Sequence, residues 1–305
     1  MKILVLGGAG YIGSVLVPKL LEEDPGLPAN KVTVLDNFLY RENSLSDCCR
    51  HKNFEVHRVD VRDSEAIKPY MNADVIIPLA GLVGAPLCDL NPVDADLVNL
   101  KHPISLFRRL SKDQRVIMPT TESAYGSNDS VCTEETPINP LSRYAKDKAT
   151  VEAILMQREN AVSLRLATVF GMSPRMRLDL LVNDFAWKAF KEHSIVLFEA
   201  HFRRTTCHIQ DIANAFIHAL ELKPGIYNVG AFSLSKLELC EALAKKLPFT
   251  FVEADVGKDP DQRNYVVSSE KIRKTGWKSK FTLEDGLDEL LKGFKMLSNN
   301  RYGNI

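Results

Sequence analysis

Residues 1–13 read MKILVLGGAGYIG, an apolar run over Lys2–Leu6 that is followed at once by glycines at every third position. The run predicts a buried strand, and the glycines predict a tight turn that opens a helix. Such a turn lets the backbone approach a pyrophosphate, to which the helix N-terminus presents N–H groups and a partial positive charge. We interpret it as a dinucleotide site, although its G-x-x-G-x-x-G spacing leaves a purely structural turn as the alternative. The residues predicted to contact the dinucleotide here are Gly7, Gly10, Tyr11, Ile12 and Gly13.

Five further apolar runs follow, with helical patterns between most of them. Several are apolar at consecutive positions, as strands buried on both faces must be. Strand–helix alternation of this kind predicts an α/β protein with a parallel, doubly wound sheet of the Rossmann type. The predicted strands are Lys31–Asp36, Phe54–Val59, Asp74–Leu79, Arg115–Pro119 and Ala161–Leu166.

After Leu166 the rhythm changes to mixed α and β structure, with one strand predicted at Ile195–Phe198. We expect residues 1–167 to form the dinucleotide-binding domain, to which the chain returns at about 205–230. We expect residues 168–204 and 231–305 to form a smaller mixed α/β domain that binds the substrate. The later helices are predicted at Leu178–Glu192, Ile209–Leu220, Lys236–Leu247 and Leu283–Leu297.

Size and composition exclude several classes of protein. The 305 residues include 39 basic and 39 acidic side chains, so no net charge favours nucleic acid or an anionic membrane as a partner. No apolar run reaches the ~18 residues of a membrane-spanning helix, and glycines interrupt the apolar start, which argues against a signal peptide. The six cysteines include no C-x-x-C pair. We therefore expect free thiols, no metal site and a cytoplasmic protein.

Polar or small residues follow three of the predicted strands. Asp36 lies 23 residues after Gly13, where an acid can accept hydrogen bonds from an adenosine ribose. A carboxylate there repels a 2′-phosphate and favours NAD over NADP; an ordinary turn aspartate is the alternative. The residues predicted to line the cofactor site after these strands are Asp36, Asn37, Asp60, Val61, Leu79, Ala80 and Gly81.

Tyr144 and Lys148 lie four residues apart on a helix predicted at Leu141–Asn160, and thus on one face of it. A nearby ammonium favours the phenolate and would lower the pKa of the tyrosine, making it a usable base. Thr121, just after the fifth strand, could hydrogen-bond the same hydroxyl. Such a pair also arises by chance on helix surfaces, but it follows the other features in an order that places all of them at the carboxyl edge of the sheet.

The chain resembles the extended short-chain dehydrogenases, the NAD-dependent nucleotide-sugar epimerase/dehydratase family. The resemblance is carried by GGAGYIG, TTESAYG, YAKDK, RLATVFG, HIQD and TGWK, and it spans nearly the whole chain. It implies that Thr121, Tyr144 and Lys148 form the catalytic triad and that Lys148 also holds the nicotinamide ribose. It further implies that Asn99 supports the cofactor region.

The resemblance also implies a nucleotide-sugar substrate. Asn183, Arg204 and Arg263 match positions that hold the diphosphate, which suits the two aligned donors of an arginine. Phe198 matches a position that contacts the base, although a buried core phenylalanine is an equal alternative. Residues 80–88, 165–185 and 195–204 resemble family members that oxidise C4 of GDP-D-glycero-D-manno-heptose, which favours a GDP-sugar. The sugar pocket is expected at Leu82, Val83, Gly84, Ser123 and Arg177.

One departure from the family pattern reduces the number of reactions that the enzyme is expected to catalyse. The 4,6-dehydratases carry Asp-Glu after the catalytic threonine, whereas this chain carries Glu122 and Ser123, so a dehydratase is disfavoured. The main expectation is NAD-dependent oxidation of a C4 hydroxyl. A 4-epimerase and a non-catalytic NAD-binding regulator are the alternatives. The resemblance also implies a homodimer formed by helices at about 92–110 and 141–160.

Overall fold

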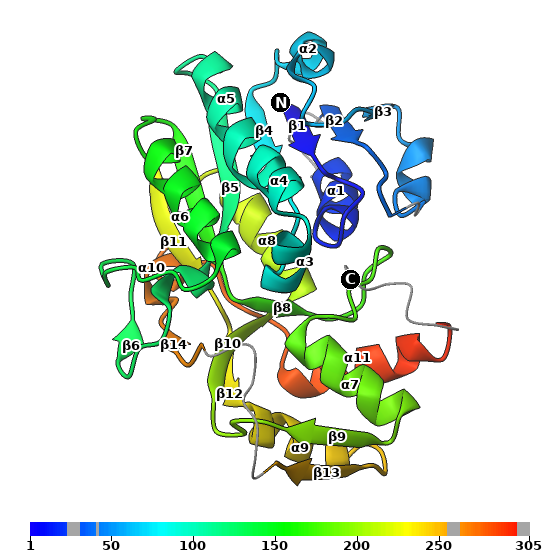
Figure 1. Cartoon of the computed structure of the whole chain (residues 1–305). Helices are drawn as coiled ribbons and strands as arrows, with labels where there is room; N and C mark the ends of the chain where they lie inside the picture. The colour runs from blue at the N-terminus through cyan, green and yellow to red at the C-terminus, as the bar shows by residue number, and fades with distance from the viewer. Residues whose placement is uncertain (23–30, 41–42, 255–262, 298–305) are drawn as a thin grey trace.

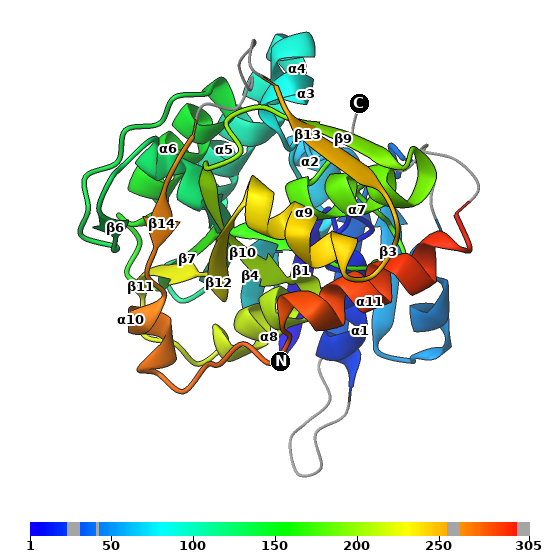
Figure 2. The same ribbon diagram turned by 90° about the horizontal axis from the view of Figure 1, so that it is seen from below.

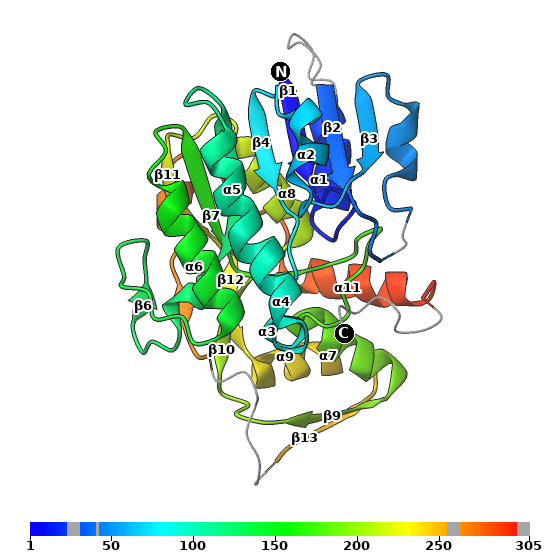
Figure 3. The same cartoon turned by 45° about the horizontal axis from the view of Figure 1, so that its top comes forward.

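The computed structural model of the chain describes residues 1–22, 31–40, 43–254 and 263–297. At its centre, seven strands pair in parallel, and Figure 3 shows them side by side. They are β1 (Lys2–Leu6), β2 (Lys31–Asp36), β3 (Phe54–Arg58), β4 (Val75–Pro78), β5 (Arg115–Thr121), β7 (Ala161–Leu166) and β11 (Gly225–Val229). Their order in the sheet is β11-β7-β5-β4-β1-β2-β3. The predicted α/β class with a doubly wound parallel sheet is confirmed.

Helices cover both faces of this sheet (Figures 1 and 3). Alternate residues of β1 explain why: Ile3 and Val5 belong to one buried apolar cluster, whereas Leu4 and Leu6 belong to another. The first cluster includes α1 (Gly13–Leu21) and α8 (Ile209–His218), and the second includes α2 (Ser64–Ile67), α5 (His102–Arg109) and α6 (Arg143–Leu155). Shorter helical segments are α3 (Ala85–Leu90), α4 (Pro92–Ala95), a π-helical turn at Asp96–Lys101, and 3₁₀ turns at Ser46–Arg50, Lys68–Tyr70 and Glu122–Tyr125.

Smaller elements pack beneath the main sheet, as Figure 1 and the view from below in Figure 2 show. One small sheet contains β8 (Thr168–Phe170), β10 (Arg203–His208) and β12 (Phe232–Ser235). Two strand pairs are formed by β9 (Ser194–Leu197) with β13 (Thr250–Glu253), and by β6 (Val131–Cys132) with β14 (Val266–Val267). The helices of this region are α7 (Leu181–Lys191), α9 (Lys236–Ala244), α10 (Glu270–Arg273) and α11 (Leu283–Phe294).

The path of the chain between these parts bears on the predicted domains. After β10 the chain enters α8 and then β11, which pairs with β7 at the edge of the main sheet. The boundaries drawn from the sequence stay a prediction, and their segments 23–30, 41–42, 255–262 and 298–305 lie outside the described residues. None of the helices in the described ranges combines the length and hydropathy needed to cross a membrane.

Candidate active site

A cavity of about 990 Å³ opens at the carboxyl edge of the main sheet. Because the strands are parallel, the residues that follow β1, β2, β4 and β5 all reach this edge. The opposite wall comes from the segment between β8 and α7 and from the elements around β9 and β10. The cavity therefore lies between the main sheet and the C-terminal elements.

The turn after β1 has room only for glycine at two positions. Gly7 has a φ of +78°, and a Cβ atom there would lie 2.5 Å from the backbone nitrogen of Ala80. A Cβ atom on Gly13 would lie 2.4 Å from the carbonyl oxygen of Gly8. Helix α1 begins at Gly13, and Ile12 at its N-cap provides no side-chain hydrogen bond, so this end suits an anionic ligand. The cavity lining includes all the turn residues predicted from the sequence, Gly7, Gly10, Tyr11, Ile12 and Gly13.

Asp36 ends β2 beside this turn. Its Oδ2 atom accepts a hydrogen bond from the backbone nitrogen of Ala9 over 2.9 Å, and its Oδ1 atom accepts one from Phe38 over 2.8 Å. Burial raises the pKa of Asp36 above its ordinary value, and these two bonds oppose that rise. The carboxylate is thus fixed at the cavity, where it can meet a ribose.

Asp60, which was predicted only as an acid in the cofactor site, is paired with an arginine. Its carboxylate binds the Arg62 side chain, with Nη2 to Oδ2 at 2.7 Å and Nε to Oδ1 at 2.9 Å, and it accepts from Asn37 Nδ2 over 3.2 Å. These hydrogen bonds hold the pKa of Asp60 well below its usual range. Asp60 lines the cavity together with Asn37, Val61 and Arg62, so the structure adds a cation where the sequence indicated only an acid.

Leu79, Ala80 and Gly81 line the cavity after β4, as predicted, but Asn99 does not. Asn99 is buried, and its side chain accepts from the Leu82 nitrogen over 2.9 Å and donates to the Leu82 oxygen over 2.8 Å. Both polar atoms of the amide are therefore used to fix the backbone of the loop that forms the wall. Asn99 therefore fixes the Leu82 backbone from behind the cavity wall, and its support of the cofactor region stays a prediction.

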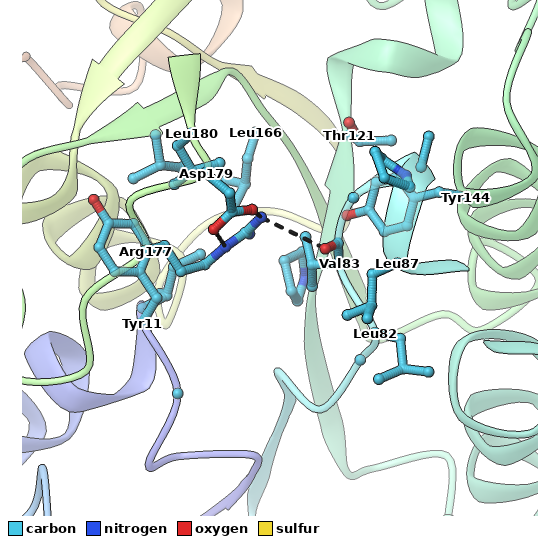
Figure 4. Close-up of a pocket in the computed structure, with 18 of the residues that line it drawn as sticks. Tyr11, Leu82, Val83, Leu87, Thr121, Tyr144, Leu166, Arg177, Asp179 and Leu180 are labelled. Carbon is cyan, nitrogen blue, oxygen red and sulfur yellow. Dashed lines mark hydrogen bonds and ion pairs between the residues drawn. The ribbon is translucent and has the colours of Figure 1, made fainter. Parts of the chain in front are cut away.

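The expected triad meets at one place in the cavity. Ser142 caps α6 by accepting from the Ala145 nitrogen over 3.2 Å, and the helix carries Tyr144 and Lys148 on one face. The Lys148 Nζ atom lies 5.9 Å from the centre of the Tyr144 ring and donates to the Pro119 oxygen over 3.4 Å. Thr121 ends β5, and all three side chains line the cavity. Figure 4 shows Thr121 and Tyr144 on the same side of it.

The electrostatics of the pair differ from the expectation. Burial raises the pKa of Tyr144 to about 12, while Arg177 and Arg263 act to lower it. Burial also lowers the pKa of Lys148 to about 8. The sequence predicted that Lys148 would lower the tyrosine pKa, but within the protein desolvation exceeds the attraction of the cations.

Eight of the nine predicted substrate residues line the same cavity as the triad. Leu82, Val83, Gly84, Ser123, Arg177, Phe198, Arg204 and Arg263 all line the cavity. Arg263 Nη1 donates to the Ser123 hydroxyl, and Arg204 places its guanidinium 5.5 Å from the centre of the Tyr265 ring. Residues distant in sequence thus line one cavity.

Asn183 does not line the cavity. Its Oδ1 atom accepts from the Gly171 nitrogen over 3.0 Å, and its Nδ2 atom donates to the Arg177 oxygen over 2.9 Å and to the Tyr11 hydroxyl over 3.1 Å. The amide is fully buried. The amide therefore links the glycine turn to the Arg177 segment and lies outside the cavity lining, where the diphosphate was expected.

Several charged residues of the cavity were not predicted from the sequence. Arg175 lies with its guanidinium 3.6 Å from the centre of the Tyr40 ring, and Asp179 binds Arg177. Lys236 donates to the Phe198 oxygen over 2.7 Å. The alternating charges in SPRMRLD, residues 173–179, were the available signal for the first two.

Glu122 points away from the cavity and does not line it. It is fully buried, and neither carboxylate oxygen has a hydrogen-bond partner within the described residues. A Cβ atom on Gly230 would lie 3.2 Å from its Oε1 atom, so the side chain is directed toward β11 and its neighbours. Burial and the charge of Glu134 raise its pKa well above the ordinary value.

The sequence profile of the NAD dependent epimerase/dehydratase family matches residues 3–230. The chain belongs to this family. UDP-glucuronic acid decarboxylase 3 of Arabidopsis thaliana is 27% identical over 321 residues, covering 98% of this chain and 90% of that protein. UDP-glucose 4-epimerase of Thermus thermophilus, solved with NAD, is 26% identical with a TM-score of 0.81, covering 97% of this chain and 99% of that one.

A third similar protein is the dTDP-glucose 4,6-dehydratase of Streptomyces venezuelae, solved with NAD bound. It shares 24% identity with a TM-score of 0.86, over 97% of each chain. As a member of this family, the protein is an NAD-dependent enzyme of the nucleotide-sugar epimerase/dehydratase type. The closely packed glycine turn and the fixed Asp36 carboxylate fit NAD as the cofactor.

Proposed function

We propose that the enzyme oxidises the C4 hydroxyl of a nucleotide-linked sugar, with GDP-D-glycero-D-manno-heptose as the favoured substrate, and gives a 4-keto nucleotide-sugar. The observation that carries the proposal is that Tyr144, Lys148 and Thr121 line the same cavity as the glycine turn and Asp36. The choice of base and sugar is supported by the resemblance of residues 80–88, 165–185 and 195–204 to GDP-heptose 4-oxidising members of the family.

The proposed chemistry begins with removal of a proton. The Tyr144 oxygen, as phenolate, accepts the proton of the C4 hydroxyl, while Thr121 hydrogen-bonds the same oxygen. Bound NAD would supply the acceptor for the hydride that leaves C4. The Arg177 and Arg263 guanidiniums favour the phenolate, and the Lys148 ammonium, 5.9 Å from the ring, adds to the positive field.

Dehydration is disfavoured by the residues after Thr121. Ser123 has no carboxyl group and is engaged by Arg263, while the Glu122 carboxyl is buried away from the cavity. Neither residue can act there as the acid and base that remove a C6 hydroxyl. The ketone therefore has no partner group for elimination at these positions.

Binding of the nucleotide diphosphate is assigned to Arg204 and Arg263, with Phe198 beside the base. Both arginines line the cavity, and their planar donor groups match phosphate oxygens. Asn183 is not included in this assignment, because its amide already makes three hydrogen bonds within the protein.

A 4-epimerase is the second candidate. It is favoured by the similarity to the Thermus thermophilus enzyme named UDP-glucose 4-epimerase, which extends over 97% of this chain. The same three residues would act, but the ketone would be reduced again on its opposite face. A regulator that binds NAD without catalysis is the third, and the assembled triad argues against it.

Incubation with NAD and GDP-heptose, followed by NMR of the sugar, separates these candidates. Oxidation predicts a 4-ketone and a stoichiometric rise in NADH fluorescence, whereas recovery of only the C4-inverted alcohol would establish the epimerase. Tyr144→Phe should lower the rate about 10²–10⁴-fold because it removes the base. Tyr70→Phe removes a hydroxyl outside the cavity lining and should keep the rate. Turnover that survives Tyr144→Phe unchanged would contradict the mechanism.

A further inference from the structure

Arg177 and Asp179 form an ion pair inside the cavity, on the segment between β8 and α7. The Arg177 Nε atom donates to Oδ1 of Asp179 over 3.2 Å, and its Nη2 atom donates to Oδ2. The two side chains are only 8% and 17% exposed, and both line the cavity. The charge of this guanidinium is therefore already compensated within the protein.

The pair faces the reacting end of the cavity. Nη2 of Arg177 also lies 3.5 Å from the Val83 carbonyl oxygen, and Figure 4 shows Val83 between the pair and Tyr144. The guanidinium is close enough to Tyr144 to oppose the rise that burial causes in the pKa of that residue. A sugar whose C4 hydroxyl reaches Tyr144 would accordingly have Arg177 and Asp179 beside its ring.

Apolar side chains line the cavity on both sides of the space between the pair and Tyr144. Leu82, Leu87, Leu166 and Leu180 are among the lining residues, and Figure 4 shows Leu166 and Leu180 beside the pair and Leu82 and Leu87 on the side of Tyr144. In such surroundings charge interactions are weakly screened. A carboxylate on the sugar would have to share one guanidinium with the Asp179 carboxylate, and two like charges at one site are strongly disfavoured.

The pair nevertheless offers unused hydrogen-bonding capacity. Nη1 of Arg177 has no hydrogen-bond partner among the residues that the structure describes, and each Asp179 oxygen accepts one bond from Arg177. A carboxylate oxygen has further lone pairs, and a guanidinium has five N–H donors. A donor and an acceptor side by side match sugar hydroxyls, which both donate and accept.

We propose that the Arg177–Asp179 pair binds hydroxyl groups of an uncharged sugar and excludes nucleotide-linked uronic acids. The inference rests on the proposed function, since it assigns the class of sugar to the same cavity. It distinguishes this enzyme from its relative in Arabidopsis thaliana, which is named for UDP-glucuronic acid. Asp179 is the specificity-determining residue, because its charge makes the guanidinium unavailable to a carboxylate.

Calorimetry on the NAD-saturated protein tests the proposal with two matched ligand pairs, GDP-mannose with GDP-mannuronic acid and UDP-glucose with UDP-glucuronic acid. The wild type should bind the neutral member of each pair at least about tenfold more tightly. Asp179→Asn keeps the shape but removes the charge, so the ratio should fall by about tenfold. Arg177→Met leaves Asp179 uncompensated, so the ratio should rise while neutral sugars also bind more weakly.

Asp184→Asn is the matched control, because Asp184 lines the same cavity but pairs with Lys188 at 2.8 Å. It should change the ratio by less than about twofold. Equal affinity of the wild type for both members, or an unchanged ratio in Asp179→Asn, would overturn the proposal. The wild-type ratio and Arg177→Met keep the test decisive if Asp179→Asn does not fold.

The outcomes also separate this inference from the proposed function. If the affinities follow the expected ratios but no sugar is oxidised, only the proposed oxidation fails. If oxidation of a neutral sugar proceeds while the uronic acid binds equally well, only the role of the pair fails. If no member of either pair binds, the role of the pair is wrong, and the NMR assay with GDP-heptose decides the proposed oxidation separately.

Discussion

Glu122 shows how one buried side chain can make stability depend on pH. Its carboxyl has no hydrogen-bond partner within the described residues, and burial raises its pKa well above the ordinary value. Between the ordinary and the raised pKa, the folded protein therefore holds a proton that the unfolded chain has lost. Stability is full below the ordinary pKa and falls as the pH rises toward the raised one.

Glu122→Gln should remove this fall in stability with rising pH, because the glutamine amide stays neutral at every pH. Urea unfolding from about pH 5 to about pH 9 should show a free energy of unfolding that falls by at least about 1 kcal/mol more in the wild type than in the variant. Glu159→Gln, which removes an exposed carboxyl, serves as the control and should follow the wild type. Parallel pH profiles of wild type and Glu122→Gln would refute the argument.

At the residue scale, sequence motifs predicted the positions of residues that are set by their immediate neighbours in the sequence. Gly7, Asp36, Tyr144 and Lys148 all line the predicted cavity because strand ends and helix spacing fix their positions. The pKa of Tyr144 could not be predicted in this way. It depends on desolvation by the surrounding walls, which come from many segments.

At the scale of elements, the turn between β1 and α1 combines two constraints that can be tested separately. Gly7 needs a positive φ of +78° and also has the Ala80 backbone 2.5 Å from the position of a Cβ atom. Gly276, after α10, has a φ of +104° with nothing within 4 Å of such an atom. The two glycines thus share the backbone conformation but differ in crowding.

We predict that Gly276→Ala costs about 1–2 kcal/mol of stability, from backbone strain alone. Gly7→Ala should cost more, because either β1 or the Ala80 segment must move, and it should also weaken NAD binding at least about tenfold. Urea unfolding and a fluorescence titration with NAD measure the two effects. Equal costs for both variants, with NAD affinity retained in Gly7→Ala, would show that the close approach to Ala80 has no consequence.

At the scale of elements, apolar sequence patterns predicted most strands of the main sheet but not all of them. The first six strands of the main sheet were predicted to within two residues at each end, because continuous apolar runs mark strands buried on both faces. β11 was missed because its sequence, GIYNV, is short and contains Asn228. The Asn228 side chain is buried, and its Oδ1 atom accepts a hydrogen bond from the Tyr125 hydroxyl over 2.8 Å. Only the tertiary fold creates this contact.

At the scale of the whole molecule, the cavity depends on contacts across great sequence distance. Tyr11 and Asn183 are bonded although 172 residues separate them, and Arg263 reaches Ser123 across 140 residues. The sequence could predict which end of the sheet carries the site. The family resemblance placed Arg177, Arg204 and Arg263 correctly at the cavity, whereas Asn183 lies outside its lining and Asp179 was missed.

The outer surface carries a feature that bears on the expected homodimer. Leu90 is 67% exposed, Val93 is 71% exposed and Leu141 is 48% exposed. They belong to neighbouring segments, since α3 packs against α6 and Arg143 donates to the Pro92 oxygen over 3.3 Å. An apolar patch at this place adjoins the helices that the family resemblance assigns to a dimer, and a second copy of the chain is its proposed occupant.

Sedimentation velocity of the wild type should therefore give a dimer, and Leu90→Glu combined with Val93→Glu should give a monomer, because charges would be buried in the interface. Met296→Glu changes a residue that is 78% exposed at the end of α11, away from the patch, and should leave the dimer intact. Since neither Leu90 nor Val93 lines the cavity, the monomeric variant should bind NAD within about twofold of the wild type. A wild type that sediments as a monomer at all concentrations would rule out this interface. A double variant that stays dimeric would place the contact elsewhere on the molecule.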